Sequence, residues 1–298
     1  MFSWITLSFI NVILGSIWGV LIKISVDIIN FRNVLTYCSI ISFCIIILYN
    51  ILTHTSFILE KKSFMYGIIS GVIFFLIDDT ISIINNTSYV QSILRLEIIF
   101  VTIFSYILFG VKISYIMIFF MCLIVVGCYI ISSNVNNSDD YSWLYLGIAA
   151  SMLSSIAVLL LKHIYRTVKN ITIPQILFNK YIGVCTFSII NQLVYNKSLV
   201  ILDKNTSLYK NYTNAVLTMS ILFASIIFSL YQIILMNAVK LSKNPSYPLA
   251  IMTLSIVGIT LLNMFLPLTY KKKTDVTLEQ WVGIILIILG IFGVSFIN

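Results

Sequence analysis

The sequence predicts an all-α, polytopic membrane protein with about ten transmembrane helices, arranged as two inverted five-helix repeats. Of the 298 residues, 60% are hydrophobic and only 9% are charged, and the mean hydropathy is +1.05. Such a composition excludes a soluble globular domain. The apolar runs are continuous, as in Ile285–Leu289, whereas strands of a membrane barrel would alternate apolar and polar residues. Helices are therefore expected throughout.

The apolar runs give the expected helices in order, each close to the roughly 20 residues that cross a bilayer. Charged or turn-forming clusters separate most of them, such as Glu60-Lys61-Lys62, Asp139-Asp140 and Lys271–Lys273. The break at Asn85–Ser88 is short and predicts a tight helical hairpin. The expected spans are 4–24, 33–53, 64–85, 89–110, 114–132, 144–164, 174–195, 215–239, 247–267 and 280–297.

Two short patterns occur in corresponding places of the two halves. Ser88–Ile93 is similar to Ser246–Ile251, and Gly15–Lys23 is similar to Ser154–Lys162. We therefore divide the chain into a first repeat (1–132), a connecting loop (133–143) and a second repeat (144–298). Five spans are an odd number, so the second repeat enters the membrane from the opposite face, an arrangement typical of transporters. Tyr89 is expected to correspond to Tyr247, and Lys23 to Lys162.

Charge and motif content exclude several functions. The net charge of +8 is scattered over short loops, so no nucleic acid is expected as a partner. No phosphate-cradling glycine loop is present, and His54 and His163 have no spacing typical of zinc ligands. We expect no enzyme activity, no cofactor and no metal. The expected partners are the lipid bilayer and a small-molecule substrate, with a second copy of the chain (a homodimer) as a further candidate.

Two adjacent carboxylates, Asp78 and Asp79, lie well inside the third expected span. An ionised carboxylate at membrane depth costs at least about 2.5–3.5 kcal/mol, so such groups are usually functional or paired. Arg95 and Glu97 lie two positions apart in the fourth span, and on a regular helix they would point to nearly opposite sides. Arg95 is then placed to meet the aspartates across the hairpin. A substrate or proton site and a purely structural ion pair both fit this arrangement.

Other candidate residues lie on the first, seventh and eighth spans. Lys180 either points into a central cavity or extends along the helix to the membrane interface. Gln232 and Trp18 could line the same cavity, although single polar residues in membrane helices often only bond neighbouring helices. Tyr89 and Tyr247 begin the fourth and ninth spans, where helix N-termini favour anionic groups. Both tyrosines fit an interfacial aromatic belt equally well.

The chain resembles the drug/metabolite transporter superfamily, which includes EamA-like and nucleotide-sugar-transporter-like proteins. The resemblance rests on Trp18-Gly19 followed by Lys23, on Leu108–Lys112 at the end of the fourth span, and on the glycines of the last span. Val111 departs from the pattern, because the family usually has an acid there. The repeat and the resemblance together predict a secondary transporter of a small polar metabolite that works by alternating access. Arg95 and Lys180 favour an anionic or zwitterionic substrate, and the adjacent carboxylates of Asp78 and Asp79 predict coupling to protons. The alternative is a membrane scaffold or assembly protein that retains the fold without transport.

Overall fold

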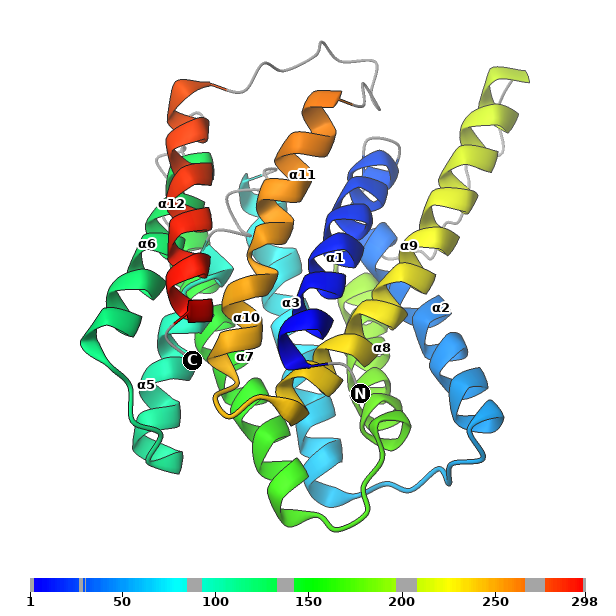
Figure 1. Cartoon of the computed structure of the whole chain (residues 1–298). Helices are drawn as coiled ribbons and strands as arrows, with labels where there is room; N and C mark the ends of the chain where they lie inside the picture. The colour runs from blue at the N-terminus through cyan, green and yellow to red at the C-terminus, as the bar shows by residue number, and fades with distance from the viewer. Residues whose placement is uncertain are drawn as a thin grey trace.

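The computed structural model describes residues 3–26, 29, 31–84, 93–132, 142–196, 208–265 and 277–296, and every regular element in these ranges is an α-helix (Figure 1). The helices are α1 (Trp4–Val26), α2 (Phe31–Leu52), α3 (Lys61–Ile84), α5 (Glu97–Phe109), α6 (Tyr115–Ser132), α7 (Ser142–Thr167), α8 (Ile173–Asn196), α9 (Leu208–Leu241), α10 (Ser246–Met252), α11 (Leu254–Phe265) and α12 (Leu278–Phe296).

The helices have the length and surface that a membrane requires. Within the described ranges, five of them are long and apolar enough to span a bilayer: α1, α2, α7, α8 and α9. Further apolar helices are shorter, among them α5, α6 and α12. The outward side of α1 carries Phe9, Ile13 and Ile17, which are 45%, 61% and 38% exposed. Their spacing of four residues places them on one face, so this face suits contact with lipid.

Each of the ten expected spans overlaps a helix, and two of them differ in detail. In the fourth span, the regular helix α5 begins only at Glu97, after a short turn at residues 93–96. The ninth span is divided into α10 and α11 at Thr253. Hydropathy averaged over a whole span does not reveal either interruption, because each lies within a run that is apolar overall.

The two halves of the chain interleave in space. In Figure 1, α1 lies in the middle of the bundle beside α9 and α11, while α6 and α12 run side by side at one edge. Helix α3 packs against α7 and α8. The hydrophobic core clusters therefore combine residues from both halves, such as Ile98 with Ile256 in one cluster and Ile46 with Leu177 in another. Much of the packing around the candidate site therefore crosses between the halves.

Glycines allow the closest of these crossings. A Cβ atom added at Gly127 of α6 would lie 2.6 Å from the Gly283 carbonyl oxygen of α12, and one at Gly283 would lie 2.7 Å from the Gly127 carbonyl oxygen. Similarly, a Cβ atom at Gly71 of α3 would lie 2.6 Å from the Gly183 carbonyl oxygen of α8. Side chains at these positions would push the backbones apart.

Candidate functional site

Lys180 lies in the interior of the bundle. It is the eighth residue of α8 and only 8% exposed. Its Nζ atom donates a hydrogen bond of 2.6 Å to Oε1 of Gln232 on α9, and lies 5.6 Å from the centre of the Tyr66 ring on α3. The structure thus brings together two of the residues singled out from the sequence. The ammonium group is buried between helices.

Glu97 supplies a buried negative charge close to this lysine. It is the first residue of α5, is 9% exposed, and accepts a short hydrogen bond from Ser154 Oγ of α7. Its carboxylate interacts electrostatically with both Arg95 and Lys180. A partly satisfied carboxylate inside a membrane bundle is costly, so it points to a function. The sequence analysis did not include Glu97 among the candidate site residues.

The local backbone explains why Glu97 was missed. The Ile98 amide donates to the Arg95 carbonyl at 3.1 Å, and the Leu96 amide to the Ile93 carbonyl at 3.0 Å, each only three residues back. The chain around Arg95 is therefore not a regular α-helix, and the expectation that Arg95 and Glu97 face opposite sides does not apply. The sequence signal that could have identified Glu97 was an acidic residue within an apolar run.

Aromatic rings line the interior beside the charges. Trp18 of α1 stacks on Phe228 of α9 with ring centres 5.1 Å apart, and Phe228 stacks on Tyr231 at 6.2 Å. Phe74 of α3 meets Phe228 edge-on at 6.1 Å. Tyr231 is adjacent to Gln232 and lies within electrostatic reach of Glu97. We call Trp18, Phe74, Phe228 and Tyr231 the aromatic wall.

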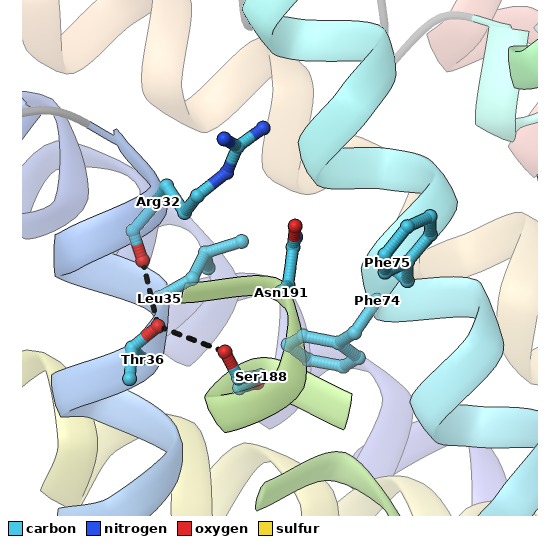
Figure 2. A pocket seen from close by; sticks show the side chains of 7 residues that line it. All are labelled: Arg32, Leu35, Thr36, Phe74, Phe75, Ser188 and Asn191. Carbon is cyan, nitrogen blue, oxygen red and sulfur yellow. Dashed lines mark hydrogen bonds between the residues drawn. The ribbon is translucent and has the colours of Figure 1, made fainter. Parts of the chain in front are cut away.

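A pocket opens beyond the aromatic wall, between α2, α3 and α8 (Figure 2). Its empty volume is about 220 Å³, including space open to solvent. It contains a positive charge and several polar groups, none of which the sequence analysis selected. Phe74 belongs both to this lining and to the aromatic wall. The lining residues are Arg32, Leu35, Thr36, Phe74, Phe75, Ser188 and Asn191.

The opposite end of α2 is closed by contacts between the halves. Asn50 Nδ2, near the end of α2, donates to the Pro174 carbonyl oxygen at 3.1 Å. Beside it, Lys62 Nζ donates to Thr167 Oγ1 at 2.9 Å, which joins the start of α3 to the end of α7. Contacts between the halves also join the pocket end, where Gln192 Nε2 of α8 donates to Asn33 Oδ1 of α2 at 2.6 Å.

The remaining sequence candidates lie elsewhere or outside the described residues. Tyr247 begins α10, is 8% exposed, and packs 6.0 Å from Trp4 in the core cluster of α5, α6 and α12. It is thus an interior residue, away from lipid and apart from Lys180. Asp78 and Asp79 lie on α3, but their side chains are outside the described part, as is all of Tyr89.

Comparison with known proteins supports the fold and nothing beyond it. No family model matches the chain, and no curated protein matches it. Among solved structures, 28 chains match. One of them, described only as the crystal structure of a protein, superposes with a TM-score of 0.71 over 99% of both chains at 11% sequence identity. At that identity the likeness concerns the fold.

Proposed function

We propose that this protein is a secondary transporter of the drug/metabolite type, which moves a small polar metabolite by alternating access between two inverted five-helix repeats. The observation that carries the proposal is that two opposite charges are buried in the bundle: Glu97, which is bonded to Ser154 of the other half, and Lys180, which is bonded to Gln232. Transporters place their substrate sites at such a repeat interface near the bilayer midplane.

Equivalent hydrogen bonds support the internal repeat. Ser16 Oγ of α1 donates to the Ser255 carbonyl oxygen of α11 at 3.3 Å. Ser155 Oγ of α7 donates to the Glu97 carbonyl oxygen of α5 at 3.2 Å. The sequence alignment pairs Ser16 with Ser155 because it pairs Lys23 with Lys162, and it pairs Glu97 with Ser255 because it pairs Tyr89 with Tyr247. Both bonds therefore connect the same two positions of the repeat.

The contact between α3 and α8 and the contact between α2 and α9 are also related by exchange of the two halves. A Cβ atom added at Gly183 of α8 would collide with the Gly67 carbonyl of α3, and Ser42 of α2 donates to the Ser225 carbonyl of α9 at 3.2 Å. Exchanging the halves converts one contact into the other, with Gly183 equivalent to Ser42 and Gly67 equivalent to Ser225. The crossing of Gly127 and Gly283 is its own equivalent, since each glycine faces the carbonyl of the other. A two-fold relation between the halves accounts for all these contacts.

We keep Asp78 and Asp79, with Arg95, as the group that couples transport to protons in this proposal. Two adjacent carboxylates in a low dielectric cannot both lose their protons cheaply.

Transport is tested with purified protein in proteoliposomes, by counterflow against a panel of anionic, zwitterionic and cationic metabolites. At least one metabolite should accumulate, and replacement of Lys180 by Met should remove that uptake while exposed Lys61→Met leaves it unchanged. The absence of counterflow for every class would favour the membrane scaffold.

Proton coupling is tested separately, with a double replacement of Asp78 and Asp79 by Asn. The variant keeps the size of the side chains and removes their titration, so exchange should persist while the pH dependence of uptake disappears. An unchanged pH profile, or a protein that does not fold, would assign the pair a structural role.

A further inference from the structure

We infer that the end of the bundle at which α7 finishes binds the headgroups of anionic phospholipids. Five exposed basic side chains lie at the ends of three helices there, and we call them the basic end. The inference does not depend on transport. The residues of the basic end are Lys112, just after α5, Arg166 and Lys169, in the last turn of α7 and just after it, and Lys240 and Lys243, at the end of α9 and just after it.

Contacts between aromatic rings and cations join these helix ends into one surface. The Arg166 guanidinium lies 4.6 Å from the centre of the Phe109 ring, so the last turn of α7 meets the last residue of α5. The Lys240 ammonium lies 5.6 Å from the centre of the Tyr165 ring, so the end of α9 also meets the end of α7. A ring contact holds a cation in place without neutralising its charge.

Nearby groups do not balance the positive charge of the basic end. The C-terminal end of α9 is already closed by the buried Lys162, which donates to the Ser242 carbonyl oxygen. Glu60, which precedes α3, is occupied in capping that helix, since it accepts from the Ser63 amide at 2.7 Å. The segments that form the basic end contain no aspartate and no glutamate: 109–115, 160–172 and 238–246. The surface is therefore suited to an anionic partner.

The surface beside Lys112 identifies that partner as a lipid. Ile107 and Leu108, in the last turn of α5, are each 65% exposed. Tyr106 and Tyr115 are 60% and 91% exposed, and tyrosine is typical of the level of the lipid headgroups. A phospholipid satisfies both parts of this surface, because its phosphate meets the cations while its acyl chains cover the apolar side chains. An acidic soluble protein would leave the apolar side chains without a partner.

The test compares two fluorescently labelled lipids with identical acyl chains, phosphatidylglycerol and phosphatidylcholine. Binding of each to the full chain is measured in a neutral detergent. Phosphatidylglycerol should bind at least about tenfold more tightly, because each basic residue near a headgroup favours an anionic lipid by about fivefold. The preference should shrink when the salt concentration rises from about 0.05 M to about 0.5 M, since salt screens exposed charges. Neither measurement needs a variant, so folding of mutants is not an issue.

A matched pair of variants then locates the binding surface. Lys112→Gln should weaken phosphatidylglycerol binding by about fivefold and leave phosphatidylcholine binding unchanged. Lys23→Gln is the control, because Lys23 is also exposed but lies at the opposite end. Its position follows from Trp4, which begins α1 and packs 6.0 Å from Tyr247, a few residues beyond the end of α9. Thermal unfolding in the same detergent checks that both variants are folded.

Each outcome of these measurements supports or overturns the lipid surface. Equal binding of the two lipids by the unmodified protein would overturn it. Equal losses for Lys112→Gln and Lys23→Gln would show that net charge, and not this end of the bundle, attracts the lipid. Tighter binding of a polyglutamate peptide than of phosphatidylglycerol would assign the basic end to an acidic protein segment instead.

Discussion

At the scale of single residues, two lysines that align in sequence have different surroundings. Lys162 of α7 is buried, and its Nζ atom donates to the carbonyl oxygens of Val239 at 3.0 Å and Lys240 at 3.2 Å, and to that of Ser242. It therefore closes the C-terminal end of α9, where a positive charge is favoured by the helix dipole. Lys23 of α1, the aligned residue, is exposed.

Replacing Lys162 by Met should reduce the free energy of unfolding by about 2–3 kcal/mol, because three carbonyl groups lose a charged donor. The measurement is unfolding of the purified protein in mixed micelles. Lys23→Met is the control and should stay within about 0.5 kcal/mol of the unmodified protein. Equal losses for both variants would show that the α9 contacts contribute little.

At the scale of helices, close crossings determine how α3 and α8 pack. A Cβ atom at Gly183 would collide with the backbone of Gly67 and Ile68, which cannot move without shifting α3. A Cβ atom at Gly15 of α1 would instead meet the Ser255 side chain at 3.1 Å. Backbone contacts are rigid, whereas a serine side chain can adjust.

Gly183→Ala should therefore lower stability by about 1–3 kcal/mol, the usual cost of overpacking. Gly15→Ala should cost less than about 1 kcal/mol, because alanine also favours the helix over glycine. Thermal unfolding in detergent compares the two variants directly. Equal losses of stability for the two variants would show that the α3–α8 backbone contact is looser than in this structure.

Helix positions were largely predictable from the sequence, but the polar contacts were not. Hydropathy located each expected span because the cost of exposing backbone to lipid enforces long apolar helices. It could not locate the turn before Glu97, which depends on hydrogen bonds to residues three positions back. The meeting of Lys180 with Gln232 was suggested by their polarity in apolar spans. The hydrogen bond from Ser154 to Glu97 depends on tertiary packing of α5 against α7, so no local sequence pattern predicts it.

At the scale of the whole molecule, contacts between the halves join the bundle at the end away from the pocket as well as at the pocket end. Lys62 with Thr167 and Asn50 with Pro174 form the contacts away from the pocket. Alternating access requires these contacts to break when the protein opens on that side. A cross-link there should therefore arrest the cycle.

A short bismaleimide linking cysteines at positions 62 and 167, in a background without the five native cysteines, should abolish uptake. Binding of a transported metabolite from the pocket end should persist, because the cross-link does not involve residues of the pocket. The reagent applied to either single cysteine is the control and should leave uptake unchanged. Full uptake after confirmed cross-linking would exclude opening at this end.

The interleaving of the halves also has a consequence for biosynthesis. Ser16 finds its partner in Ser255, and Asn11 contacts Met252 at 3.5 Å, more than two hundred residues later in the chain. As the ribosome delivers helices in order, α1 must wait in the bilayer without these interhelical partners until the last third of the polypeptide has emerged. Assembly is consequently a late event, and a nascent chain ending near residue 132 would offer its exposed polar side chains to quality-control machinery.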